Sequence, residues 1–312
     1  MYALFRKELA DHLDSIRFLI VLALTLLVAG VSLYSALGGI GQAVAESYTS
    51  GNVFLRLFVT SSGSVPSFVS FISLIGPLIG LILGFDAINS EKNAGTLNRL
   101  LAQPIYRDAV INGKFLAGVF VIALLVISMV LLVSGVGLLR IGIPPSGEEV
   151  MRLIVFVIFT IVYISFWLGL SILLSVVSRH AATSALSVVA VWLIMGFFIG
   201  LIAAGLAGAI YPQNNTIEMA ENYEAFRQAF SRVSPSILYT ESTATILDPA
   251  VRSLGITSIA EFEQLYVSAA GVLPFGQSLL LVWPHMVGMI AETVAAFVIS
   301  YIVFIKQEIR GA

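Results

Sequence analysis

Few side chains in this sequence could carry chemistry, and their types and spacing argue against catalysis by the chain alone. It contains no cysteine, which excludes thiolate nucleophiles, disulfides and Cys-ligated metals. The three histidines, His12, His180 and His285, lie far apart with no acidic cluster around them, so we expect no metal site. Gly113-Lys114 is followed by neither Ser nor Thr, and no glycine precedes Gly113 at the spacing that a phosphate-binding loop requires. We therefore predict that the chain is not an enzyme by itself.

Two carboxylates lie next to or inside apolar runs. Asp86 follows Gly84-Phe85, a context that intramembrane aspartyl proteases use, but no second intramembrane Asp is present to share the proton of such a dyad. Glu292 lies about ten residues into the last apolar run, where a carboxylate is costly unless it is neutral, paired or hydrated. Glu292 is either a protonated structural group between helices or an intramembrane polar site on a substrate path, and the sequence leaves both open.

The composition is that of a membrane protein. Hydrophobic residues make up 58% of the chain and charged residues 11%, whereas soluble domains carry roughly 25% charged residues. A chain with so few charges could not cover a water-facing surface. The net charge of -2 says little about partners, because the 16 basic and 18 acidic residues are distributed by topology, and we expect no basic face for nucleic acid. We predict an all-α integral membrane protein.

Six apolar runs are long enough to span a hydrocarbon core of roughly 30 Å. They lack the alternation of a barrel strand, and backbone groups in lipid must be satisfied within the segment, so we expect helices. The first run is too long for the apolar region of a cleaved signal peptide, so it should be retained. The predicted spans are 18–37, 68–85, 115–139, 153–177, 185–211 and 283–305.

Lys and Arg are unevenly divided between the two sets of connecting segments. With the N-terminus inside, the inner set holds ten basic residues and the outer set six, although the outer loops are longer. The positive-inside rule then places both termini in the cytoplasm. The inner set comprises Arg6, Lys7, Arg17, Lys92, Arg99, Arg107, Lys114, Arg179, Lys306 and Arg310, and the outer set Arg56, Arg140, Arg152, Arg227, Arg232 and Arg252.

Two segments outside the spans have a helical pattern of their own. Residues 1–17 place apolar side chains at three- and four-residue steps, which predicts an amphipathic interfacial helix that leads into the first span and is also able to contact a partner. Residues 212–282 form the longest outer loop, with helical periodicity over Thr216–Val233 and Ser258–Val272. We expect a small helical external subdomain there.

Small residues recur every four positions in two of the spans. Such ladders let two helix backbones approach closely, either within one molecule or between subunits. The second span carries Gly76, Gly80 and Gly84, and the fifth carries Gly196, Gly200, Ala204 and Gly208. If one ladder forms a dimer interface, we favour that of the fifth span.

The polar stretch 86–114 is long for a connection between two spans. Its middle has an apolar ridge of Leu97, Leu100 and Leu101 flanked by charge, and Pro104 ends the turn. An apolar ridge outside the membrane favours docking into a groove of another protein. We predict that 86–114 is a cytoplasmic loop that binds a partner.

The same stretch resembles the first cytoplasmic loop of ABC-2 type permeases, in the branch that includes the nitrous-oxide-reductase maturation permease and related multidrug or sodium exporters. The N-terminal run Phe5, Arg6, Lys7, Glu8 and Leu9 is similar to the interfacial helix of that family. The loop pattern is matched at Glu91, Gly95, Thr96, Leu97, Leu100, Leu101, Pro104 and Arg107, then at Gly113-Lys114, and it also encloses Arg99.

The resemblance implies that 1–312 is a single transmembrane permease domain with six helices of the ABC-2 (type V exporter-like) architecture. Two such subunits, as a homodimer, would receive two ABC ATP-binding subunits in a prokaryotic cell membrane. ATP and Mg would be bound by the ATPase partner and no cofactor by this chain. The implied function is ATP-driven export of an unidentified substrate, with 86–114 as the coupling loop and 212–282 capping the exit path.

Two alternatives of other classes stay open. One is a stand-alone channel or proton-coupled carrier that uses Glu292, and the other is a membrane scaffold without transport, whose main feature is the external subdomain.

Overall fold

The computed structural model describes residues 2–47, 54–61, 66–96, 106–212, 217–251, 254 and 273–306, and these parts contain helices and no strands. The helices are α1 (Tyr2–Leu13), α2 (Ile16–Ser47), α3 (Arg56–Val59), α4 (Phe68–Gly84), α5 (Asn89–Asn93), α7 (Arg107–Ile141), α8 (Gly147–Val177), α9 (Ala181–Leu193), the π-helical turn η1 (Ile194–Phe198), α10 (Ile199–Ile210), α11 (Ile217–Ser231), α12 (Pro235–Leu247) and α14 (Phe275–Lys306).

The six predicted spans are confirmed as helices that are long and apolar enough to cross a membrane. All six are longer than predicted, and in every one except the fifth the added residues include a charged side chain. Gly142, at a φ of 73°, ends the third, and a capping box between Ser146 and Glu149 starts the fourth. The spans are Ile16–Gly38, Phe68–Asn93, Arg107–Ile141, Gly147–Val177, Ala181–Ile210 and Phe275–Lys306.

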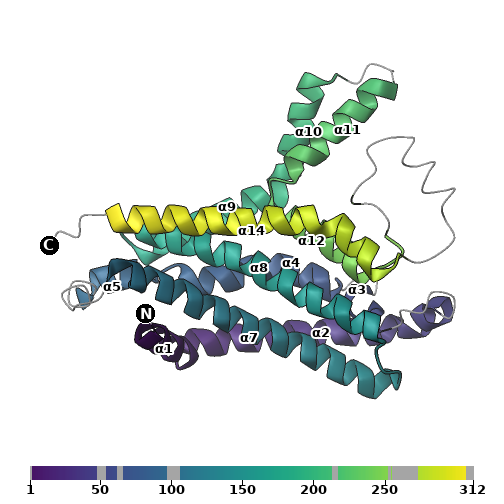
Figure 1. The fold of residues 1–312 in the computed structure, drawn as a ribbon, viewed down its shortest axis with the longest axis horizontal. Helices are drawn as coiled ribbons and strands as arrows, with labels where there is room; N and C mark the ends of the chain where they lie inside the picture. The colour runs from purple at the N-terminus through teal and green to yellow at the C-terminus, as the bar shows by residue number, and fades with distance from the viewer. Residues whose placement is uncertain are drawn as a thin grey trace.

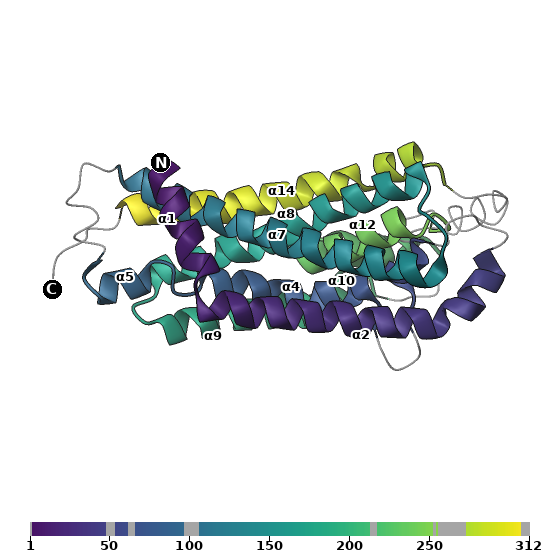
Figure 2. The ribbon, with the colours of Figure 1, turned by 90° about the horizontal axis from the view of Figure 1, so that it is seen from below.

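The spans run side by side in an elongated bundle with α8 near its centre (Figure 1). α8 packs against α4, α7, α12 and α14, and its Phe156, Tyr163 and Trp167 are fully buried. One end of the bundle carries α1, α5 and the end of α14 at Lys306, and we call it the α1 end (Figure 1). There α1 lies crosswise to the spans (Figure 2), as expected of an interfacial helix.

The glycine ladder of the second span is used within the molecule. A Cβ on Gly80 would lie 2.7 Å from the backbone nitrogen of Leu168 and 2.7 Å from Cβ of Trp167. Gly76 and Gly84 face α8 at similarly short range. The ladder therefore lets α4 and α8 pack backbone to backbone.

Because α4 and α8 approach so closely at Gly80, adding a single methyl group there should markedly lower the stability of the fold. Gly80→Ala should lower stability by about 1–3 kcal/mol, since the rigid backbone of Leu168 cannot give way. Thermal unfolding in detergent, followed by size-exclusion chromatography, measures it. Gly30→Ala is the matched control, because its Cβ would meet nothing within 4 Å and it should unfold like the parent. Equal unfolding of the two variants would contradict the packing described.

The ladder of the fifth span is not used in this way. The span bends at η1, and α10 leaves the bundle to pack on α11 as a hairpin that stands away from the other helices (Figure 1). Ala203 and Ala207 face inward, whereas Gly200 has open space around it. The proposal that Gly196, Gly200, Ala204 and Gly208 meet a second subunit stays a prediction.

The described part of 212–282 contains α11, α12 and the first turns of α14, which begins at Phe275, before the predicted start of the last span. α11 confirms the helix predicted over Thr216–Val233, and the helix predicted over Ser258–Val272 lies outside the described residues. α12, which packs among α4, α8 and α14, was not predicted from the sequence. It is the part of the expected external subdomain that lies against the spans.

α12 is buried although it is rich in hydroxyl groups, because those groups have partners. The Ser242 hydroxyl donates to the carbonyl oxygen of Leu238 at 2.6 Å, and the Tyr239 and Thr160 hydroxyls lie 3.0 Å apart. The ring of Tyr239 stacks on that of Tyr163, with 4.4 Å between centroids. Hydroxyl groups that hydrogen-bond to carbonyl oxygens of their own helix or to a facing hydroxyl remove most of the free-energy cost of burying a polar helix.

A buried arginine joins three helices at the end of the bundle opposite α1. Arg152, with no exposed surface, uses all five of its N–H groups. It donates to Glu148 Oε1 from Nε and Nη2 at 3.0 and 2.8 Å, to the carbonyl oxygens of Ile246 and Leu273 at 2.9 and 2.7 Å, and to the Ser278 hydroxyl at 3.1 Å. Arg152 thereby fixes the end of α12 between α8 and α14.

Candidate coupling site

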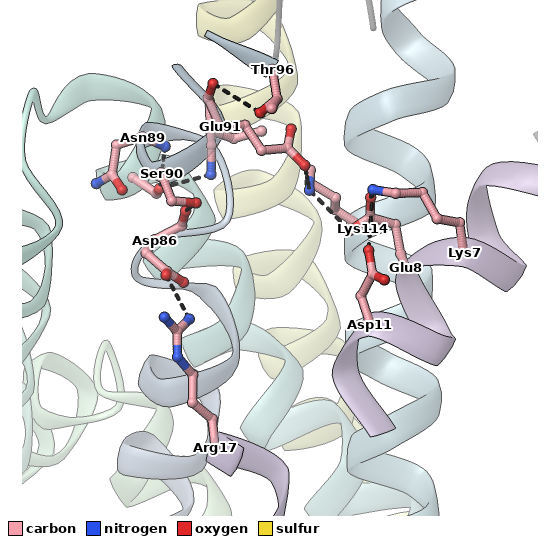
Figure 3. A network of polar contacts seen from close by, with 12 residues as sticks. Lys7, Glu8, Asp11, Arg17, Asp86, Asn89, Ser90, Glu91, Thr96 and Lys114 are labelled. Atoms are coloured by element: carbon pink, nitrogen blue, oxygen red, sulfur yellow. Dashed lines mark hydrogen bonds and ion pairs between the residues drawn. The ribbon is translucent and has the colours of Figure 1, made fainter. Parts of the chain in front are cut away.

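A network of charged and polar side chains connects α1, α2, α4, α5 and α7 at the α1 end (Figure 3). It lies beside a polar cavity of about 190 Å³ that Glu8, Asp86, Glu91 and Lys114 help to line. The network sits where the predicted coupling loop leaves and rejoins the spans.

Lys114 is the centre of the network. Its Nζ lies 2.9 Å from Oε2 of Glu8 on α1 and 2.8 Å from Oε1 of Glu91 on α5. The side chains are 6%, 7% and 19% exposed, respectively. A buried charge is tolerated when its partners are close and hydrogen-bonded, and it becomes costly when one of them is removed. One ammonium group therefore ties the interfacial helix and the start of the loop to α7.

The charge state of Glu8 follows from these contacts. Burial alone would raise the pKa of the Glu8 carboxyl, but the charges and hydrogen bonds of Lys114 and then Lys7 outweigh it and lower the pKa below 4.5. Lys7 lies 3.1 Å from Oε1 of Glu8 and 3.1 Å from Oδ2 of Asp11. Glu8 is thus ionised at neutral pH and keeps its bond to Lys114.

A second ion pair links the start of α2 to the turn that follows α4. Nη1 of Arg17 donates to Oδ2 of Asp86 at 2.5 Å, and the guanidinium lies 5.3 Å from the ring centroid of Phe85. Asp86 thus has a structural partner in Arg17.

The end of α8 holds α5 from the other side. The Ser175 hydroxyl oxygen accepts hydrogen bonds from the backbone N–H groups of Ile88 and Asn89, at 3.1 and 3.2 Å. The Asn93 amide donates to the carbonyl oxygen of Arg179 at 3.1 Å. α5 is therefore bonded to α7 through Glu91 and to the end of α8 through Asn89 and Asn93, which gives the residues that follow it a fixed starting point.

The family model described as ABC-2 family transporter protein matches residues 2–309. The chain belongs to the ABC-2 transporter family. The permease resemblance seen in the loop is confirmed, and a six-helix membrane fold agrees with it.

Two curated relatives are similar to part of this ABC-2 protein, and both are described as probable ABC transporter permease protein NosY. The one from Pseudomonas aeruginosa is 35% identical over 124 residues, which are 40% of this chain and 40% of the relative. The one from Stutzerimonas stutzeri is 33% identical over 141 residues, which are 43% of this chain and 46% of the relative. The chain thus matches less than half of the length of each of these relatives.

The coupling residues expected from the sequence fall into two groups. Glu91 belongs to the network, Gly95 adopts a φ of +68°, and the Thr96 hydroxyl donates to the carbonyl oxygen of Glu91 at 3.2 Å. Arg107 lies exposed in the first turn of α7. The other expected residues lie outside the described part of the chain: Leu97, Arg99, Leu100, Leu101 and Pro104. The docking ridge itself therefore stays a prediction.

The expected interfacial residues of α1 point in different directions. Glu8 is buried in the network, and Phe5 meets the ring of Phe120 edge to face, with 6.1 Å between centroids. Leu9 is half-buried, and Arg6 and Lys7 are exposed. Lys114 belongs to the family pattern, but no role was predicted for it from the sequence. A lone cation at the start of an apolar run, with carboxylates on both neighbouring elements, was the available signal.

Glu292 lies apart from this network. Its Oε2 is buried and has no hydrogen-bond partner among the described residues. Nε2 of His285, on the same helix, lies 2.8 Å from Oε2 of Glu241 on α12, so this ring nitrogen is engaged elsewhere. Glu292 stays a possible intramembrane polar site.

Proposed function

We propose that the chain is the membrane subunit of an ATP-driven exporter, and that a separate ABC ATPase subunit docks on the α1 end at 86–114. The observation that supports this most is the attachment of 86–93, the turn after α4 together with α5. It bonds to α2 through Asp86, to α7 through Glu91 and to α8 through the backbone of Ile88. A force applied to the residues after α5 would reach α2, α4, α7 and α8 together.

The proposed mechanism uses differential binding. ATP closes two ATPase subunits, the closed pair prefers one arrangement of the permease, and the spans shift toward that arrangement. ATP and Mg belong to the ATPase, while this chain binds the moving partner and transmits its displacement.

The proposed assembly contains two copies of this chain and two ATPase subunits in a prokaryotic cell membrane, with both termini cytoplasmic. The fifth span supports the pairing of two permeases, because its ladder and the large apolar side chains of α10 are left open. The excess of basic residues in the inner segments supports the orientation.

Co-purification tests the docking. Changing Leu97, Leu100 and Leu101 together to Asp should abolish retention of the ATPase on the tagged permease, because charged side chains would replace the apolar ridge. Changing the same three residues to Met is the matched control and should keep the ATPase bound. An ATPase that stays bound to the triple Asp variant would overturn the assignment of 86–114 as the docking loop.

A stand-alone proton-coupled carrier is the second candidate, favoured by the unpaired buried oxygen of Glu292. It predicts proton flux in liposomes that contain the permease without any ATPase, and Glu292→Gln should abolish this flux. Absence of flux from the ATPase-free protein would remove this candidate.

A further inference from the structure

An apolar groove runs between α7 and α8, away from the charged network. It has a volume of about 580 Å³ and is lined by α7 from Ile127 to Leu138, by α8 from Val150 to Ile158, and by Phe54 and Pro145. Ser134 supplies the one hydroxyl group of the lining, and no charged side chain contributes. Such a lining excludes a headgroup or a charged peptide as the occupant, because either would lose its hydration without a partner.

The position and length of the groove fit one leaflet of a bilayer. Both helices are membrane spans, and the lining lies in the half of each that is far from the α1 end. From Ile127 to Leu138 the helix rises about 16 Å. Half of a hydrocarbon core is about 15 Å. The groove thus extends over the depth that a single acyl chain occupies.

Buried hydrogen bonds hold one wall of the groove in place. The Phe54 backbone N–H donates to Oε1 of Glu149 at 3.0 Å, and the Ser146 backbone N–H donates to Oε2 of the same carboxylate at 2.8 Å. Glu149 is itself buried at the start of α8. Gly135 leaves room in the opposite wall, because a Cβ there would meet nothing within 4 Å. The groove is therefore a formed feature of the fold.

We propose that this groove binds an acyl chain of a membrane phospholipid. An acyl chain gains no hydrophobic free energy when it moves from the bilayer into an apolar groove. Its preference for the groove therefore comes from dispersion contacts with the concave wall. A second copy of the chain is a weaker candidate, because α7 lies along the edge of the bundle opposite the one from which the α10–α11 hairpin leaves (Figure 1). The proposal is independent of the transport function and of the ATPase.

Photolabelling of the full chain tests the proposal. The protein is placed in nanodiscs of phosphatidylethanolamine and phosphatidylglycerol with a trace of phosphatidylethanolamine that carries a diazirine on one acyl chain. Lipid adducts are mapped by mass spectrometry and should favour 127–138 and 150–158 at least about threefold over other lipid-facing segments. Gly135→Leu should remove this preference by filling the groove. The same change at Gly30, which also has open space around it, should leave the preference intact.

A photoreactive amino acid identifies the occupant. A benzophenone side chain placed at Leu131, which lines the groove and is 65% exposed, should link to lipid. The same group at Leu139, which is 84% exposed but outside the lining, should yield less lipid adduct. Equal adducts at the two positions, labelling unaffected by Gly135→Leu, or a link from position 131 to a second copy would each overturn the proposal.

Discussion

Lys114→Met should be among the most damaging single substitutions in this protein. It leaves Glu8 and Glu91 buried without their shared cation, and breaking a buried ion pair in this way costs about 3–5 kcal/mol. The expected result is a large fall in the thermal unfolding temperature in detergent. In the proposed complex with an ATPase, the stimulation of ATP hydrolysis by substrate should also be lost. Lys7→Ala is the control: Lys7 also touches Glu8, but it is 49% exposed and should cost at most about 1 kcal/mol.

A compensated variant separates stability from coupling. Replacing all three groups, as Glu8→Gln, Glu91→Gln and Lys114→Met, removes the uncompensated charges and should restore much of the stability. If the network transmits motion, ATPase stimulation should stay low in this stable variant. Full stimulation there would show that the network only holds the fold together.

The network also predicts an acid limit to stability. Because the pKa of Glu8 is lower in the folded state than its ordinary value of 4.5, the stabilisation is fully present above pH 4.5 and is lost as the pH falls through the lowered value. The stability difference between the parent protein and Glu8→Gln should therefore shrink in acid.

The spans were predictable because membrane helices are specified locally, by length and hydropathy. Which helices pack against one another was harder to predict from the sequence. Gly76, Gly80 and Gly84 carry the same spacing as the fifth-span ladder, yet only the second-span glycines approach another helix more closely than ordinary van der Waals contact among the described residues. The partner of a ladder depends on tertiary arrangement, which spacing alone does not encode.

Only part of the candidate site was predictable, because some of its contacts join residues that are far apart in the sequence. The motif indicated Glu91 and the α1 run, but the role of Lys114 requires knowing that Glu8, far away in sequence, lies 2.9 Å from it. α12 was missed because its Ser and Thr residues resemble a loop until their hydroxyls are seen to be satisfied by backbone carbonyls and a facing hydroxyl.

Arg152→Ala should release α12 from the bundle. The change removes five hydrogen bonds at once and leaves the carbonyl oxygens of Ile246 and Leu273 without the donor that reached them. Each buried acceptor left without a donor costs about 1–3 kcal/mol, so a loss of several kcal/mol is expected. Arg152→Lys should rescue little, because an ammonium cannot reproduce the forked geometry of a guanidinium.

The absence of cysteine makes this release directly measurable. Thr243→Cys, at a fully buried position of α12, should resist a membrane-impermeant maleimide in the otherwise unchanged chain and react quickly when Arg152→Ala is added. Arg140→Ala is the control, since Arg140 is exposed at the same end of the bundle and should leave position 243 protected. If position 243 stays protected in the Arg152→Ala protein, the inner contacts of Tyr239 with Thr160 and Tyr163 hold α12 without the arginine. Protection lost in the Arg140→Ala protein as well would mean that labelling reports general unfolding of that end.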